Sequence, residues 1–191
     1  MSTSADVRLA VLGRAGVGKS AVVVRFLTNR FIWEYDPTLE ATYKHEVVVD
    51  EETISMDIFD TAGQDESGSW SVWADALLLV YDVTERGSLT YASHIKTLAA
   101  RPVPVVLLGN KIDLEHARQV SFEEGEQAAM ELGAGFFECS ACTSEGGLSE
   151  AFLELARETR RIRAAQSRPR RRSSTTHVRQ AFSKMLTKIG S

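Results

Sequence analysis

The stretch that decides the fold is Gly13-Arg14-Ala15-Gly16-Val17-Gly18-Lys19-Ser20, which fits the pattern G-x-x-x-x-G-K-[ST] at every fixed position. The apolar, β-branched run Val7 to Leu12 precedes it and predicts a strand, whereas Ala21 to Leu27 after it predicts a helix. A glycine-rich turn between a strand and a helix can point its N–H groups at an anion, and the positive end of the helix attracts that anion. The sequence therefore predicts a polyphosphate site.

The residues of this loop have expected roles at a polyphosphate. Lys19 is expected to reach the β and γ phosphates, and Ser20 to ligate Mg²⁺, which prefers hard oxygen ligands. The remaining contacts are expected from the backbone of the loop and the start of the helix, at Gly13, Ala15, Gly16, Val17, Gly18 and Ala21.

Strand and helix patterns alternate along the rest of the chain. Alternating apolar and polar residues predict an antiparallel hairpin from residues 42–50 and 53–60. Continuous apolar runs at residues 77–81 and 105–108 are typical of buried strands in a parallel sheet. Further helices are expected at residues 88–100, at 121–132 with a capping box of Ser121 and Glu124, and at 148–164, with a short strand at 135–139.

This alternation predicts an α/β fold, a doubly wound, mostly parallel six-stranded sheet with one antiparallel edge strand. In such a sheet the ligand site lies beyond the C-terminal ends of the strands. The motifs that follow strand ends are therefore the candidates for chemistry.

One of these motifs is Asn110-Lys111-Ile112-Asp113, which follows a predicted buried strand and has the pattern N-K-x-D. A carboxylate at Asp113 can accept hydrogen bonds from N1–H and the exocyclic amine of guanine, whereas adenine presents an acceptor at N1. By itself N-K-x-D is short and fits a strand-end turn equally well. Beside a phosphate loop it predicts a guanine-nucleotide site.

Two further segments carry residues suited to Mg²⁺ and to hydrolysis. Asp60 begins the segment D-T-A-G-Q at a strand end, where its carboxylate can hold the Mg²⁺ shell through water. Gly63 exposes a backbone N–H, and Gln64 can orient an attacking water. Thr38, after Y-D-P, can supply a second hydroxyl to Mg²⁺. Taken alone, D-x-x-G also fits a turn, and Thr38 an ordinary exposed threonine.

Together these motifs make residues 6–165 resemble a Ras-superfamily small GTPase. The signature segments of that family appear in order at residues 13–20, 35–40, 60–64, 110–113 and 140–141. The resemblance implies a monomeric switch that binds GDP and GTP with Mg²⁺, hydrolyses GTP, and presents different loops to effector and regulator proteins in each state. It implies Lys19, Thr38 and Gln64 as catalytic residues.

The resemblance also implies contacts with the base and the γ-phosphate. Phe31 is expected to pack against the edge of the base, Lys111 to cover the ring, and the Ala141 backbone to support guanine O6. Thr38 and Gly63 are expected to contact the γ-phosphate. The remaining implied nucleotide contacts are Tyr35, Leu114, Ser140 and Cys142.

Departures from the family pattern bear on hydrolysis. Ala15 stands where most Ras proteins have glycine, and its methyl group crowds the space that an activating protein's arginine enters. Cys142 replaces a lysine, and residues 65–76 and 88–104 are about three and about five residues shorter than expected. The sequence therefore leaves open a second function, a nucleotide-binding interaction module with little or no hydrolysis. A small-molecule kinase is disfavoured by the N-K-x-D segment and by the lack of an obvious lid.

Length and charge predict a nucleotide-binding domain over residues 1–165 and a basic tail over residues 166–191. The chain has 191 residues, 43% of them hydrophobic, and a net charge of −4. That charge is uneven, because residues 157–191 contain eleven Arg and Lys side chains and a single acidic one, Glu158. The acidic body argues against nucleic acid as a partner, whereas the tail favours an anionic partner.

The sequence also carries expectations about location. No signal peptide pattern and no apolar run of about 20 residues is present, so we expect a cytoplasmic protein that can also be nuclear. Cys139 and Cys142 are expected to be reduced thiols, and the ending T-K-I-G-S has no prenylation box. Residues 177–189 have the spacing of a short basic amphipathic helix that could touch an anionic membrane, although a solvated, disordered tail fits the same residues.

Overall fold

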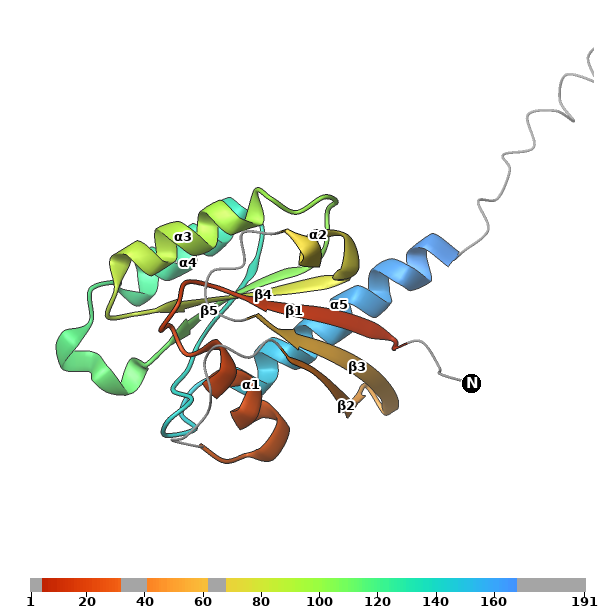
Figure 1. Ribbon diagram of the computed structural model, residues 1–191, viewed down its shortest axis with the longest axis horizontal. Helices are drawn as coiled ribbons and strands as arrows, with labels where there is room; N and C mark the ends of the chain where they lie inside the picture. The colour runs from red at the N-terminus through yellow and green to blue at the C-terminus, as the bar shows by residue number, and fades with distance from the viewer. Residues whose placement is uncertain (1–4, 32–40, 62–67, 168–191) are drawn as a thin grey trace, which may run out of the picture.

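A single mixed sheet forms the centre of the protein. The computed structural model describes residues 5–31, 41–61 and 68–167, and within these ranges six strands pair in the order β2-β3-β1-β4-β5-β6 (Figure 1). Among them β2 runs antiparallel to β3, and the other pairs are parallel. This confirms the predicted fold class. The strands are β1 Val7–Leu12, β2 Ala41–Val49, β3 Glu52–Asp60, β4 Ala76–Asp82, β5 Val105–Asn110 and β6 Gly135–Glu138.

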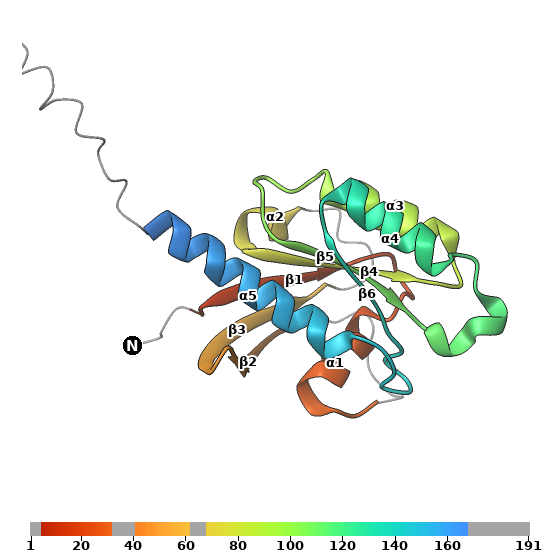
Figure 2. The same cartoon turned by 180° about the vertical axis from the view of Figure 1, so that it is seen from behind.

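Helices cover both faces of this sheet. The helix α1 (Lys19–Thr28) and the long α5 (Leu148–Ser167) pack on one face (Figures 1 and 2). The other face is covered by α2 (Ser69–Trp73), α3 (Arg86–Lys96) and α4 (Phe122–Leu132). The β5–α4 connection contains the 3₁₀ helix η1 (Ile112–Ala117). Each face therefore has its own hydrophobic core.

The central strands are buried on both sides. Every residue of β4 and of β5 is buried, as expected of parallel strands with helices above and below. On the α1 and α5 face, the rings of Phe26 and Phe152 stack with centroids 3.9 Å apart. Burial of an aromatic side chain of this size contributes about 2–3 kcal/mol. Within the described residues we find no helix that is both long and apolar enough to traverse a lipid bilayer.

Local sequence signals explain most of the helix boundaries. The capping box at the start of α4 is present, because the Glu124 N–H donates to Ser121 Oγ at 3.2 Å and the Ser121 N–H donates to Glu124 Oε2 at 2.9 Å. The predicted end of α3 at Ala100 is wrong, since the N–H groups of residues 97–99 donate to carbonyls three residues back rather than four. The short elements α2 and η1 were not predicted because five and six residues are too few for helical periodicity to show.

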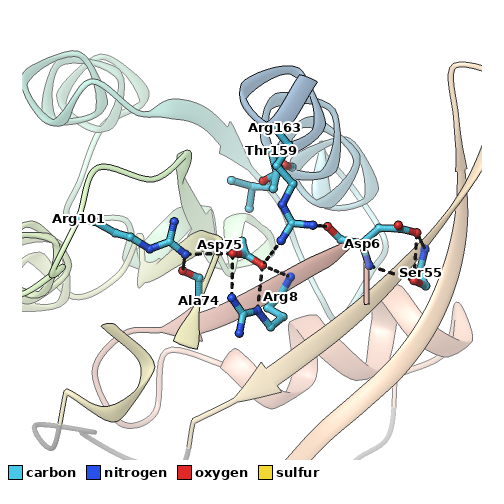
Figure 3. A network of polar contacts seen from close by, with 9 residues as sticks. Asp6, Arg8, Ser55, Ala74, Asp75, Arg101, Thr159 and Arg163 are labelled. Carbon is cyan, nitrogen blue, oxygen red and sulfur yellow. Dashed lines mark hydrogen bonds and ion pairs between the residues drawn. The ribbon is translucent and has the colours of Figure 1, made fainter. Parts of the chain in front are cut away.

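A network of arginines around Asp75 joins the N-terminal ends of β1 and β4 to α5 (Figure 3). The Asp75 carboxylate is buried and accepts hydrogen bonds from Arg8 Nε at 3.0 Å, from Arg101 Nη2 at 3.0 Å and from Arg163 Nη2 at 2.7 Å. Burial raises the pKa of this carboxyl, but the hydrogen bonds from Arg8 and Arg101 and the charge of Arg163 outweigh it and bring the pKa to about 2. An unfolded Asp titrates near a pKa of about 3.9, so the network stabilises the fold fully above that value and loses its contribution as the pH falls toward 2.

Replacing Asp75 by asparagine is expected to lower the free energy of unfolding by about 2 kcal/mol at pH 7, because the amide leaves three guanidinium groups without their carboxylate. Urea unfolding followed by circular dichroism measures the loss. The difference from the wild type should shrink between about pH 4 and pH 2, because the unfolded carboxyl becomes protonated near pH 4 while the folded one keeps its charge down to about pH 2. Glu52→Gln is the control, because Glu52 pairs with Arg160 at the surface and should change stability by less than about 0.5 kcal/mol. Equal losses in the two variants would contradict the role given to Asp75.

Candidate functional site

The phosphate-loop motif lies at the C-terminal edge of the sheet, between β1 and α1. Gly18 caps α1 with a φ of 96°, a left-handed conformation that favours glycine, and a Cβ there would lie 2.5 Å from Asn110 Nδ2. A Cβ at Gly13 would lie 2.2 Å from the carbonyl oxygen of Val80 in β4. Glycine at these two positions therefore lets the loop lie close to β4 and β5.

Lys19 is buried inside this loop. Its Nζ donates to the carbonyl oxygens of Gly13 at 2.9 Å and Arg14 at 3.3 Å. Burial lowers the pKa of the ammonium, and the nearby Asp60 carboxylate opposes that shift. A cation held inside a ring of backbone groups suits a polyanionic ligand.

Ser20 and Asp60 form a second part of the same site. Asp60 ends β3 and is only 2% exposed, and the Ser20 side chain lies close to its carboxylate. Burial raises the pKa of Asp60, and the nearby Ser20 hydroxyl and the charge of Lys19 oppose that shift. Its Oδ1 atom is buried without a hydrogen-bond partner in the described part of the chain. A buried carboxylate oxygen of this kind, next to a hydroxyl, fits a hard cation such as Mg²⁺.

Asn110 connects the phosphate loop to the loops that follow β5 and β6. Its Nδ2 donates to the Val17 carbonyl oxygen at 2.9 Å, and its Oδ1 accepts from the Ala141 N–H at 3.1 Å. The side chain is buried at the end of β5. One amide therefore fixes three loops that lie far apart in the sequence.

Lys111 makes a second link between the base-binding motif and the phosphate loop. Its Nζ donates to the Gly16 carbonyl oxygen at 2.8 Å and pairs with Asp82 Oδ2 at 2.7 Å. The other carboxylate oxygen of Asp82 accepts from the N–H and the hydroxyl of Thr84, at 2.8 and 2.6 Å. Sequence reasoning missed Asp82, although a carboxylate at the end of a buried strand is a signal that could have indicated it.

The segment Ser140-Ala141-Cys142 lies between Asn110 and α1. Arg25 of α1 donates from Nε to the Ala141 carbonyl at 2.7 Å and from Nη2 to the Cys142 carbonyl at 2.5 Å. The Ala141 N–H, which the family resemblance directs at guanine O6, points to Asn110. Arg25 was also missed from the sequence, because its partners are backbone groups more than 100 residues away.

The structure places most of the other predicted contacts near these loops. Asp113 and Leu114 are exposed in η1, just after Lys111. Ala15 is exposed in the phosphate loop, and Phe31 is partly buried shortly after α1. The predicted contacts Tyr35, Thr38, Gly63 and Gln64 lie outside the described residues.

Comparisons with known proteins agree with this geometry. Residues 8–161 match the Ras family. The chain is 56% identical to the Ras-related and estrogen-regulated growth inhibitor of Homo sapiens, over an alignment of 199 positions that covers 100% of both chains. It is 55% identical to the Bos taurus protein of the same name, again over 100% of both. The Ras-like protein rasW of Dictyostelium discoideum is 37% identical over 96% of this chain and 89% of its own length.

Asn110→Ala is expected to lower the free energy of unfolding by about 3 kcal/mol, because the Val17 carbonyl and the Ala141 N–H lose their buried partner together. It should also weaken GDP binding more than about tenfold, since the loops it joins would separate. Chemical unfolding and titration with a fluorescent GDP measure the two effects.

The matched control is Asp113→Ala, at an exposed position of the same motif. This variant should keep its stability within about 0.5 kcal/mol while losing its preference for GDP over ADP. An Asn110→Ala protein as stable as the Asp113→Ala protein would contradict the connecting role of Asn110.

Proposed function

The chain belongs to the Ras family, and we propose that its site holds GDP or GTP together with Mg²⁺ and hydrolyses GTP slowly to GDP and phosphate. The observation that carries this proposal is the pair of bonds from Asn110 to Val17 and Ala141. They bring a phosphate loop and a guanine-type motif, which are about 90 residues apart in the sequence, to one edge of the sheet.

The phosphate half of the proposed site uses the buried charges described above. Lys19 stabilises negative charge on the β and γ phosphates, and the loop N–H groups hold them in place. Ser20, Asp60 and Thr38 would hold Mg²⁺, which when bound neutralises phosphate charge. The buried Oδ1 of Asp60 supports this assignment. Gln64 orients the water that attacks the γ-phosphate.

The base half of the proposed site follows from hydrogen-bond complementarity. Asp113 accepts from the N1–H and the exocyclic amine of guanine, which excludes adenine. The stem of Lys111 covers the ring while its ammonium is held by Gly16 and Asp82. Further contacts come from Phe31, Tyr35, Leu114, Ser140, Ala141 and Cys142.

The composition of the phosphate loop supports hydrolysis that an activating protein stimulates poorly. Ala15 is exposed in the phosphate loop, and its methyl group would occupy space that an arginine from an activating protein enters. The alternative function, a nucleotide-binding interaction module with little or no hydrolysis, is suggested by Ala15 and by the short segment at residues 65–76. Hydrolysis in the absence of other proteins distinguishes the two.

Gln64→Leu is expected to lower the single-turnover rate of GTP hydrolysis by up to about 100-fold, because leucine cannot hold the attacking water. The rate is measured by chromatography of the nucleotide bound to purified protein, with and without Mg²⁺. Gln127→Leu is the matched control, since Gln127 lies exposed on α4 and bonds Glu131 at 2.9 Å. Equal rates in the Gln64→Leu variant and the wild type would favour the interaction module.

The shared name of two relatives, Ras-related and estrogen-regulated growth inhibitor, suggests a role in growth-related signalling. We propose that this protein acts as a monomer in growth-related signalling in the cytoplasm and nucleus, with effector and regulator proteins reading the loops around Thr38 and Gln64. In this proposal residues 1–165 form the nucleotide-binding domain. Residues 166–191 form a basic tail that contacts anionic membrane surfaces.

Removal of residues 168–191 is expected to abolish sedimentation of the protein with vesicles that contain phosphatidylserine, because most of its clustered positive charge is lost. The charge variant R170Q/R171Q/R172Q, which keeps the apolar residues of the tail, should lose most of this binding as well. Vesicles of phosphatidylcholine alone are the control. If truncation leaves both vesicle binding and the distribution in cells unchanged, the tail has no such role.

A further inference from the structure

Arg14 has a contact that the nucleotide motif does not require. Its backbone carbonyl accepts from Lys19 Nζ at 3.3 Å, so its main chain lies against the lysine of the phosphate loop. Its guanidinium forms an ion pair with Glu85, between β4 and α3. One residue therefore links the phosphate loop to a neighbouring element.

The residue at the other end of this ion pair is firmly held. The Glu85 N–H donates to the Asp82 carbonyl at 3.0 Å, and the Glu85 carbonyl accepts from the N–H and the hydroxyl of Ser88 at 2.9 and 2.6 Å. Ser88 is completely buried, and its hydroxyl also accepts from the Asp82 N–H at 2.9 Å. Glu85 thus projects from a closed turn, residues 82–88, that joins β4 to α3.

The turn contacts the Arg14 guanidinium and is also linked to the phosphate loop through Lys111. A Cβ at Gly87 would lie 3.3 Å from Arg14 Nη1, so the guanidinium lies directly against this residue of the turn. Asp82, at the start of the turn, holds Lys111, which in turn donates to the Gly16 carbonyl. The phosphate loop is therefore connected to one turn at two of its residues, Arg14 and Gly16.

We propose that Arg14 is a positioning residue of the nucleotide site: its ion pair with Glu85 holds the phosphate loop in its closed shape and slows nucleotide release. This inference rests on the proposed function, since it concerns the regulation of the same site. The Arg14 and Glu85 side chains are 43% and 42% exposed, so solvent screens the pair and its effect is modest. Exposed pairs of this kind are worth up to about 1 kcal/mol, which corresponds to a release rate two- to five-fold faster when the pair is lost.

The experiment measures release of a fluorescent GDP from the full chain after addition of excess unlabelled GDP. Arg14→Ala and Glu85→Ala should each release it two to five times faster than the wild type. The double variant should be no faster than either single one, because both remove the same interaction. The charge exchange R14E/E85R should restore most of the wild-type rate. In about 1 M salt, where screening acts within about 3 Å, the wild-type rate should rise toward that of the alanine variants.

Arg86→Ala is the matched control. Arg86 forms an ion pair of similar exposure with Glu124 of α4, at 2.7 Å, and should leave the release rate unchanged. Melting temperatures in excess GDP report whether any variant is unfolded, and the charge exchange tests the pair even if a single variant is unstable.

Two results would overturn this inference and leave the proposed function standing. Release at the wild-type rate from both alanine variants would show that the pair does not hold the loop. Slower release from Glu85→Ala with faster release from Arg14→Ala would show that Arg14 holds the nucleotide by direct attraction to the phosphates. Failure of the wild type to bind fluorescent GDP at all would overturn the proposed function together with the inference.

Discussion

The buried amide of Asn110 is the contact on which the arrangement of the site depends. An asparagine side chain offers donors at one atom and an acceptor at the other, and here each faces the backbone of a different loop, at Val17 and Ala141. Because the amide lies at the end of a fully buried strand, a lost bond would not be replaced by water and would cost about 1–3 kcal/mol. The close approach of Gly18 to Nδ2 shows that the loop is shaped around this amide.

The buried charged groups at the two edges of the sheet differ in how well their charged forms are stabilised. At the N-terminal ends of β1 and β4, the Asp75 carboxylate is matched by arginine donors, and its lowered pKa shows that the charged form is stabilised. At the C-terminal ends of the strands, burial outweighs the contacts that stabilise the charged forms. Burial raises the pKa of Asp60 and lowers that of Lys19, so both charged forms are less stable than in water. Groups that are costly to bury without a ligand are typical of a binding site, and the opposite edge supplies stability away from it.

The sequence was sufficient for the fold class and for locating the motifs that meet at one edge of the sheet, because strand periodicity and short motifs are local properties. The buried runs of β4 and β5 and the capping box of α4 were predicted and are confirmed. The end of α3 depends on a change to bonds three residues back, which no residue pattern signals. The pairs Asp82–Lys111 and Arg14–Glu85 depend on the order of the strands, so they became visible only when β4 was placed between β1 and β5.

The turn between β4 and α3 supports both halves of the site. Lys111 has its ammonium fixed between Gly16 and Asp82, so only its aliphatic stem remains to cover a base, and the position of that stem is set by the turn. Arg14 connects the phosphate loop to the same turn three residues further on, at Glu85. A displacement of this turn would therefore move the supports of the phosphate and base loops together.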